Sequence, residues 1–247
     1  MDLNSDVGEG FGAWRMGDDA AMLAVVTSAN IACGFHAGEP EIMRRVCGTA
    51  VARGVRIGAH VGYRDLAGFG RRAMGVPPRQ VQDETLYQLA ALDGFARAAG
   101  DRVRYVKPHG ALYHAAASDP DIAAAVAAAV AEYDPGLAVL GPTVGVLEAA
   151  AAEAGIRYLA EGFADRGYGV DGRLVPRGQP GAINGADEAV AQAVSIAQRG
   201  TARSGTAEVA VRAQSLCVHG DTPDAVAMAR RVREALQHVG IDIAAVT

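Results

Sequence analysis

Short apolar runs alternate with longer Ala-rich segments along the whole chain. The short runs have the length of buried strands, and the longer segments repeat their larger apolar residues at helical spacing. This alternation indicates repeated βα units around a parallel sheet. The predicted strands are Met1–Asp6, Val26–Ala32, Val55–His60, Arg104–Lys107, Leu137–Leu140, Arg157–Ala160 and Ser215–Val218. The pattern therefore predicts an α/β fold with about seven strands.

Two of the predicted helices have recognisable ends. One is predicted to begin after Ser118 as its N-cap, with Pro120 in the first turn, and to end at Asp134-Pro135-Gly136. The last helix is predicted to begin with Thr222 as the cap and Pro223 at the first helical position. The residues on the inward faces of these two helices are Ile122, Val126, Val130 and Tyr133, and Val226, Ala229, Val232 and Leu236.

The chain of 247 residues has no stretch of linker composition. One long irregular region, about 163–184, is polar and Gly-rich. We therefore expect a single domain over residues 1–247 with one elaborate loop.

Charge and cysteine content exclude some classes of protein. The formal net charge is -5, no Lys/Arg-rich run is present and aromatics make up 5%, which argues against a nucleic-acid partner. Neither a signal peptide nor a long uncharged apolar run points to secretion or a membrane. Three cysteines without a CxxC pair imply no disulfide framework, so a cytoplasmic location is expected.

Polar and titratable residues follow most of the predicted strands. In parallel α/β folds ligands bind at the carboxyl ends of the strands, so these residues are expected to converge on one mouth of a barrel or curved sheet. A single histidine is more often a hydrogen-bonded structural group, but four of the six lie at strand ends. The residues are Asn4, Asp6, Glu9, Asn30, His36, His60, Lys107, His109, Glu161, Asp165, Arg166, His219 and Asp221.

Two short stretches hold the densest polar groups. Asn4-x-Asp6-x-Gly8-Glu9 is able to hold a cation, an ammonium or a water, although a simple Asx-type turn explains it too. In Lys107-Pro108-His109 the two polar side chains leave the strand on the same side, and a buried Lys there needs an anion or carboxylate to balance it.

Arginine-rich loops are candidates for gripping an acidic substrate. The stretch from His60 to Arg72 has three arginines and three glycines, as expected where a loop approaches a carboxylate or phosphate, or in a solvated basic loop. Arg166, beside Asp165, either grips a carboxylate in bidentate fashion or forms an internal salt bridge.

Other chemistries receive less support. Cys33 lies three residues before His36, which allows a Cys/His nucleophile pair, but a free Cys at the end of a buried strand is usually packing. The sequence has no GxxxxGK[ST], GxSxG or HExxH motif, which disfavours an independent P-loop ATPase, an α/β-hydrolase and a zincin.

Five stretches carry a resemblance to a known family: LNSDVGEG, SANIACGFHAGEP, RVRYVKPHGALYH, EGFADRGYGVDGRLVPRGQPGA and LCVHGD. They resemble the LamB/YcsF lactam-utilisation family, in the same order from Asp2 to about Asp221. The sequence departs from the family's pattern at Val61-Gly62, Glu39 and His114. These departures bear on the detailed structure of the loops at the rim and not on the resemblance itself.

The resemblance implies a seven-stranded (β/α) barrel-like fold akin to the glycoside hydrolase/deacetylase superfamily. It also implies the role of the A component of a three-component 5-oxoprolinase, which converts 5-oxo-L-proline to L-glutamate with ATP, and the B and C components as partners. ATP is expected as a co-substrate with Mg²⁺, with no bound organic cofactor.

On this interpretation the predicted site has three parts. The catalytic candidates are Asp6, His36, His60, Lys107, His109 and His219. The substrate-binding candidates are Asn4, Glu9, Asn30, Arg72, Glu161, Asp165, Arg166 and Asp221. A metal, if one binds, is expected at Asp6 and His60.

Two other functions remain open at this point, and so does a homo-oligomeric state. One is a metal-dependent carbohydrate deacetylase, but those enzymes usually show an HxxxH pair and Arg64 stands four residues after His60. The other is a non-catalytic protein that only binds the substrate for its partners.

Overall fold

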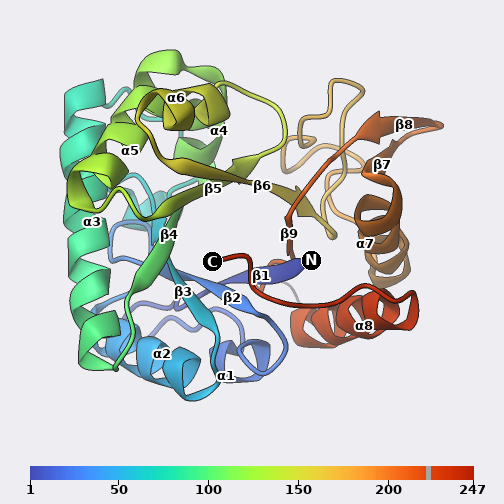
Figure 1. The fold of residues 1–247 in the computed structure, drawn as a ribbon, viewed down its shortest axis with the longest axis horizontal. Helices are drawn as coiled ribbons and strands as arrows, with labels where there is room; N and C mark the ends of the chain where they lie inside the picture. The colour runs from blue at the N-terminus through green and yellow to red at the C-terminus, as the bar shows by residue number, and fades with distance from the viewer. Residues whose placement is uncertain (221–223) are drawn as a thin grey trace.

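A closed barrel of parallel strands forms the centre of the computed structural model, which describes residues 1–220 and 224–247 (Figure 1). The strand order is β1-β2-β3-β4-β5-β6-β9, and β9 closes the barrel between β6 and β1. The prediction of an α/β barrel with seven parallel strands is confirmed. The strands are β1 Asp2–Val7, β2 Ser28–Ala32, β3 Arg56–Val61, β4 Val103–Pro108, β5 Ala138–Pro142, β6 Arg157–Phe163 and β9 Ser215–Cys217.

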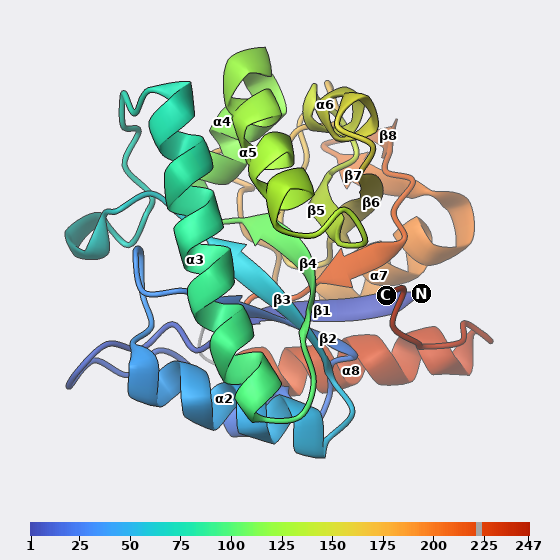
Figure 2. The same ribbon diagram turned by 60° about the vertical axis from the view of Figure 1, so that its left-hand side comes forward.

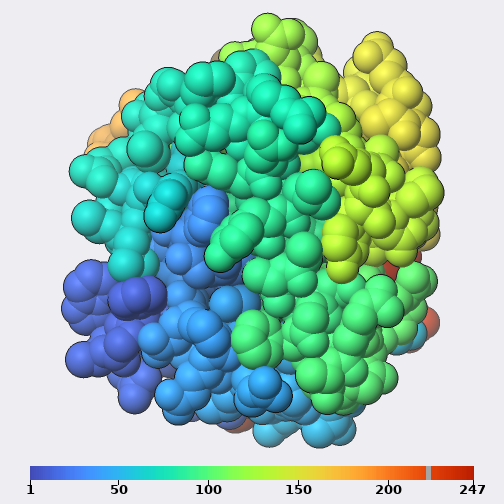
Figure 3. Space-filling model, turned by 90° about the vertical axis from the view of Figure 1, so that its left-hand side faces the viewer, coloured from blue at the N-terminus to red at the C-terminus, as the bar shows by residue number. Residues whose placement is uncertain are grey.

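Helices cover the outside of the barrel, because each strand returns to its parallel neighbour through a crossover (Figures 1 and 2). Figure 3 shows one covered face, on which α3 runs between α2 and α5. The helices are α1 Asp19–Met22, α2 Pro40–Ala52, α3 Pro78–Ala98, α4 Gly110–Ser118, α5 Pro120–Tyr133, α6 Leu147–Glu153, α7 Ala186–Arg199 and α8 Ala225–His238, with a short 3₁₀ helix η1 at Leu66–Gly68. No helix within the described residues is long and apolar enough to cross a bilayer.

The N-cap of α5 differs from the prediction by one residue. Ser118 ends α4, and its hydroxyl donates to the carbonyl of His114. Asp119 is the cap instead, because its carboxylate accepts the backbone N–H groups of Asp121 and Ile122.

The last helix, α8, begins at Ala225. Ala229, Val232 and Leu236 are buried, as the helical spacing predicted. The predicted cap, Thr222, and the predicted first helical residue, Pro223, lie outside the described residues.

One hairpin was not predicted. β7 Thr201–Ser204 and β8 Ala207–Ala210 form an antiparallel pair beside the barrel. Their residues are mostly at least partly exposed, so they lack the apolar run that marks the barrel strands. The region 163–184 is irregular, as predicted, with isolated bridges between Arg166 and Ile183 and between Tyr168 and Leu174.

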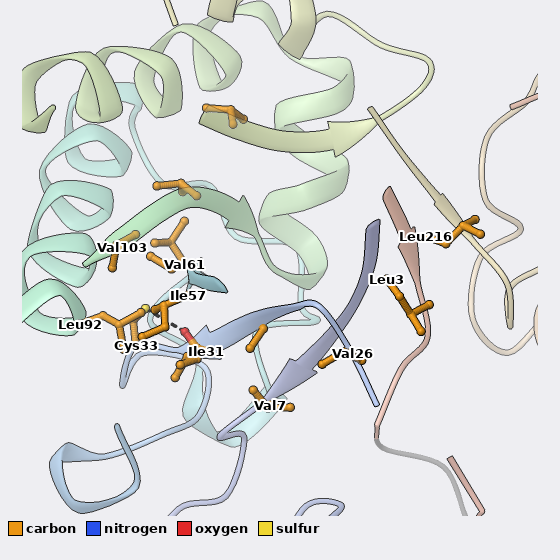
Figure 4. Packing of buried hydrophobic residues seen from close by; sticks show 14 of the residues in the cluster. Leu3, Val7, Val26, Ile31, Cys33, Ile57, Val61, Leu92, Val103 and Leu216 are labelled. Atoms are coloured by element: carbon orange, nitrogen blue, oxygen red, sulfur yellow. Dashed lines mark hydrogen bonds between the residues drawn. The ribbon is translucent and has the colours of Figure 1, made fainter. Parts of the chain in front are cut away.

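The two faces of the barrel strands differ in chemistry. The outward face packs against the helices, and Figure 4 shows Ile31, Ile57 and Leu92 side by side in this core. The inward face carries polar residues that alternate with the apolar ones. Tyr105 fills the lower interior, where its ring lies so close to Gly58 that an added Cβ at Gly58 would collide with it.

The residues after α8 close the amino-terminal end of the barrel. Val246 packs against Tyr105, Ala138, Leu140 and Leu159. In Figure 1 both chain ends lie at the middle of the barrel. The amide of Ala244 donates to the carbonyl of Met1, and Arg157 donates to the carbonyl of Val246. The carboxyl-terminal end of the barrel is not closed by these residues.

Candidate functional site

A cavity of about 520 Å³ lies at the carboxyl ends of the barrel strands. Five of the six predicted catalytic residues line it: Asp6, His60, Lys107, His109 and His219. They come from β1, β3 and β4 and from the segments that follow β4 and β9. The predicted convergence of strand ends is therefore present in the structure.

Lys107 is buried at the centre of this group. Its Nζ lies 3.0 Å from Glu161 Oε2 and 3.2 Å from Asp6 Oδ1. Burial by itself lowers the pKa of Lys107, but Asp6, Cys217 and Glu161 outweigh burial and raise it well above its usual value. The ammonium is thus held charged, since acceptors surround it on several sides.

Asp6 joins Lys107 to the histidines. Its Oδ2 lies 3.4 Å from His60 Nε2 and 3.9 Å from His219 Nε2. Burial raises the pKa of Asp6, but His60 and Lys107 outweigh burial, so the pKa lies well below its usual range. A carboxylate therefore stands at the floor of the cavity.

Asn4 and Asn30 lie one layer deeper in the barrel, and neither lines the cavity. The Asn30 amide donates to Asn4 Oδ1 and Asp6 Oδ1, each at 2.8 Å, while the Tyr105 hydroxyl donates to Asn30 Oδ1 at 2.7 Å. The Asn4 amide donates to the Ser215 hydroxyl at 2.7 Å. The Asn30 amide therefore supports Asp6 from below, and Asn4 is connected to Asp6 through Asn30.

His60 and His109 contact each other through Nε2 and Nδ1, 3.0 Å apart, with their rings at 86°. Each of the two rings is oriented by a backbone carbonyl. His60 Nδ1 donates to the carbonyl of Lys107 at 3.1 Å, and His109 Nε2 donates to the carbonyl of Phe69 at 2.9 Å. Because a carbonyl only accepts, these two hydrogen bonds fix which nitrogen of each ring carries a proton.

The loop that holds His109 docks closely on the start of α4. The carbonyl of Gly70 accepts the amide of Ala111 at 2.9 Å. Gly110 has a φ of +54°, and a Cβ there would meet the Gly70 carbonyl oxygen at 2.6 Å. Glycine is therefore required directly after His109, both for its backbone angle and for this approach.

His36 and Glu9 form a second group beside His109 and do not line the cavity themselves. His36 Nε2 lies 3.2 Å from Glu9 Oε1, and the His36 ring stacks on His109 at 3.7 Å. Burial and His60 lower the pKa of His36, so its ring is neutral. His36, the sixth predicted catalytic residue, therefore lies next to His109 but does not line the cavity.

Asp165 and His219 form a pair on the opposite side of the cavity. His219 Nδ1 lies 2.8 Å from Asp165 Oδ2, and its ring stacks on Phe163 at 5.5 Å. Burial by itself lowers the pKa of His219, but Asp165 and Asp6 outweigh burial and raise it. The Nδ1–H of His219 faces Asp165, which leaves Nε2 toward Asp6 and the cavity.

The arginines do not lie as predicted from the sequence. Arg72 pairs with Asp65 and does not line the cavity, whereas its neighbour Arg71 does. Arg166 lines the cavity but is buried, and it donates to the carbonyls of Ala182 and Val175. Arg166 therefore holds the 163–184 loop by hydrogen bonds to backbone carbonyls, where the sequence left open a grip on a carboxylate or an internal salt bridge.

Several lining residues were not identified from the sequence. They are Arg71, Tyr113, Phe163, Leu174 and Arg177. Tyr113 stands four residues after His109, so helical spacing alone places it on the same side. The Tyr113 hydroxyl and Glu161 Oε1 are buried without a hydrogen-bond partner among the described residues. Tyr113 lines the cavity, whereas Glu161, a predicted substrate-binding residue, contacts Lys107 without lining it.

The cysteines offer no nucleophile in these surroundings. Cys33 lies in the apolar core with its thiol toward the carbonyl of Ile31, and burial raises its pKa. Cys217 lies 3.3 Å from Lys107 Nζ, yet burial still raises its pKa well above the usual value. Asp221, a predicted substrate-binding residue, lies outside the described residues.

Within residues 1–220 and 224–247, two groups of side chains have the donors that a metal ion requires. Glu9, His36, His60 and His109 each offer a ligand atom, and these atoms lie within 4.8 Å of one another. Asp6, Cys217 and His219 form the second group. The predicted metal pair, Asp6 and His60, is divided between these two groups, although the two side chains touch.

Known proteins share this chain's sequence and fold over nearly its full length. The protein of Nocardia farcinica that is named as the A subunit of 5-oxoprolinase is 64% identical, with 99% of this chain and 98% of that protein covered. The protein of the same name from Streptomyces griseus is 56% identical, with 99% of each chain covered. The crystal structure of a lactam utilization protein from Thermus thermophilus aligns with a TM-score of 0.93 at 43% identity, covering 99% of this chain and 98% of that one. The LamB/YcsF family matches residues 1–247, and the chain belongs to that family.

Proposed function

We propose that this chain is the A component of an ATP-dependent 5-oxoprolinase, and that its cavity binds 5-oxo-L-proline and opens the ring to L-glutamate. Two curated relatives at 64% and 56% identity carry the name of that 5-oxoprolinase component. The sequence has no P-loop. ATP use, with Mg²⁺, therefore depends on the assembled complex with the B and C components, and yields ADP and phosphate.

The chemistry explains why ATP is needed. A five-membered lactam is stabilised by resonance and recloses easily. Phosphorylating its oxygen makes the ring carbon more electrophilic, and water then attacks that carbon. Addition of water forms a C–O bond and releases a proton, and collapse of the adduct breaks the ring C–N bond as the nitrogen takes up a proton. This leaves γ-glutamyl phosphate, which a second water hydrolyses to L-glutamate and phosphate.

One observation carries the proposal: Lys107, Asp6 and three histidines surround a single cavity. On this proposal, an oxyanion or a phosphoryl group develops its negative charge beside Lys107, because a fixed buried cation stabilises such charge strongly. Arg71 and Arg177 at the cavity wall suit the carboxylate of the substrate.

The histidines divide the proton transfers between them. His219, whose pKa Asp165 raises, suits donation of a proton to the leaving nitrogen. On the other side, His60 Nε2, His109 Nδ1 and Asp6 Oδ2 are hydrogen-bond acceptors that face the cavity floor. They suit orientation of the attacking water.

The test is release of glutamate from 5-oxoproline with ATP, by this chain mixed with the B and C components, leaving out each component in turn. Activity is expected only with all three. Lys107→Ala and His109→Ala are each expected to lower turnover by about 10²-fold or more, as for lost charge stabilisation and positioning.

His238→Asn provides the matched control, because His238 lies at the exposed end of α8. Full turnover in Lys107→Ala and His109→Ala complexes that still bind 5-oxoproline would reduce this chain to a substrate-binding role. Activity of the B and C components without this chain would refute the proposal altogether.

A further inference from the structure

Four electron-rich atoms face one point at the cavity floor. His60 Nε2 lies 3.0 Å from His109 Nδ1, 3.4 Å from Asp6 Oδ2 and 3.8 Å from Glu9 Oε1. His109 Nδ1 lies 3.3 Å from Glu9 Oε1. All four side chains are buried.

The backbone decides the protonation of the two imidazoles. His60 Nδ1 and His109 Nε2 both donate to carbonyls. In neutral rings the two nitrogens that face each other therefore both present lone pairs. Two lone pairs and two carboxylate oxygens repel one another, and one shared proton would satisfy a single pair of them. A positive charge at the centre of this arrangement would stabilise it, because two lone pairs face each other 3.0 Å apart beside Glu9 and Asp6.

We propose that Glu9, His60 and His109 hold a divalent transition-metal ion through Oε1, Nε2 and Nδ1. A tetrahedral ion with bonds of about 2.0–2.2 Å has ligand atoms about 3.3–3.6 Å apart. The three separations of 3.0, 3.3 and 3.8 Å between these atoms bracket that value. The planes of the His60 and His109 rings stand at 86°, so one ion can lie in both planes.

His36 belongs to the surroundings of this site and is not a ligand. Its ring is parallel to that of His109, 3.7 Å away and within 3°. An ion in the plane of one ring would lie far out of the plane of the other. His36 Nε2 instead donates to Glu9 Oε1, and its Nδ1 has no hydrogen-bond partner among the described residues. This contact orients the carboxylate.

The chemistry of the three ligand atoms indicates which class of metal ion would bind. Two imidazole nitrogens and one carboxylate oxygen suit Zn²⁺ or a similar first-row ion better than Mg²⁺ or Ca²⁺, which prefer oxygen. Three protein ligands leave a fourth position open. His60 and His109 line the cavity, so the open position faces the substrate side, with Asp6 Oδ2 beside it.

The ion would supply what the proposed function needs at this point. When bound, it lowers the pKa of a coordinated water and so provides a nucleophile at neutral pH. This role rests on the proposed function, whereas binding of the ion does not.

The test begins with Zn²⁺ alone and the isolated, metal-stripped chain, measured by calorimetry and by metal content after dialysis. One Zn²⁺ per chain is expected. His60→Asn, His109→Asn and Glu9→Gln should each weaken binding by more than about 100-fold, and His36→Asn by about 10- to 100-fold, as for an outer partner. His238→Asn should leave the affinity unchanged.

Co²⁺ substitution provides a second readout that does not depend on variants. The intense visible absorption of four-coordinate Co²⁺ is expected with the original chain. No saturable Zn²⁺ site in that chain, or unchanged affinity in folded His60→Asn and His109→Asn chains, would overturn the inference and leave a shared proton between the rings. Zn²⁺ binding without 5-oxoprolinase activity in the full complex would instead refute the proposed function alone.

Discussion

His219 and Asp165 illustrate how a residue's neighbours set its chemistry. His219 is buried, and burial alone would keep its imidazole neutral. Asp165 lies 2.8 Å from its Nδ1 and Asp6 lies 3.9 Å from its Nε2, so two carboxylates favour the charged ring. At His36 burial and the neighbouring His60 lower the pKa, although Glu9 Oε1 lies 3.2 Å from its Nε2.

A pH profile tests this difference. Because the pKa of His219 is raised, its proton is present at low pH and is lost as the pH rises through that pKa. Asp165→Asn removes the main charge that raises it, so turnover of the complex should fall at a lower pH than in the original chain. Turnover at neutral pH should also fall by about 10²-fold.

Asp171→Asn is the control, since Asp171 is an exposed carboxylate of the same loop region. An alkaline limb at the same pH in the Asp165→Asn and Asp171→Asn complexes would show that His219 is not the proton donor.

The inward direction of strand side chains was predictable from the sequence, whereas the choice between adjacent loop arginines was not. Lys107, His60 and Asp6 point inward because strand residues alternate between faces. Arg71 and Arg72 are adjacent in a loop, and only the Asp65 contact decides which of them turns away. No periodicity constrains such a choice.

At the scale of elements, Asp93 of α3 connects this helix to β4 and α5 through hydrogen bonds. Its Oδ1 accepts the amide of Val103 at the start of β4, at 2.8 Å. Its Oδ2 accepts Arg97 Nε and the hydroxyl of Tyr133 at the end of α5, each at 2.6 Å. Burial raises the pKa of Asp93, but these hydrogen bonds outweigh burial and lower it.

Asp93→Asn should therefore lower the free energy of unfolding by about 2 kcal/mol at neutral pH, the scale of hydrogen bonds to a charged group. A lowered pKa means that the stabilisation is complete above the ordinary Asp value and is lost as the pH falls through the folded-state pKa. The difference from the original chain should shrink as the pH falls below the ordinary pKa of an aspartate. Urea denaturation at several pH values measures it.

Asp83→Asn in the same helix is the matched control, because Asp83 forms an exposed pair with Arg79. It should change the free energy of unfolding by less than about 0.5 kcal/mol. Equal effects of the two substitutions would contradict the fastening role of Asp93.

Helices and strands were predictable from the sequence where a single sequence pattern marks them clearly. Every barrel strand was predicted, because each is short and buried and most of them are apolar runs, although β1 carries four buried polar residues. The β7–β8 hairpin was missed because its residues alternate weakly and are partly exposed. The α5 cap was misplaced because Ser118 and Asp119 are both good caps, and only the end of α4 separates them.

At the scale of the whole molecule, the two ends of the barrel have different tasks. Val246 closes the amino-terminal end over Tyr105, Leu140 and Leu159. The cavity occupies the other end. The apolar closure and the cavity thus lie at opposite ends of the barrel axis, as in other α/β barrels.

Val246→Asp tests that separation. A carboxylate against this apolar cluster should lower the free energy of unfolding by about 1–3 kcal/mol, while turnover of the folded complex stays unchanged. Val170→Asp is the stability control, because Val170 is 82% exposed. Loss of turnover in a folded Val246→Asp complex would show that the two ends are coupled.

The convergence of the site was predictable only through the fold. Asp6, Lys107 and His219 are more than a hundred residues apart along the chain, and closure of the barrel brings them together. Contacts that arise between strand ends, such as the stacking of His36 on His109, were not predictable, since they depend on how two loops pack.

The polar interior also bears on how the chain reaches a single structure. Sliding β1 by one residue would place Leu3 among Asn30, Tyr105 and Ser215, and would leave several buried donors without acceptors. An apolar barrel lining would tolerate such a slip, whereas this hydrogen-bonded interior penalises it heavily. The residues that build the floor of the cavity therefore also select the strand alignment during folding, so altered floor chemistry risks a misaligned barrel as well as an inactive one.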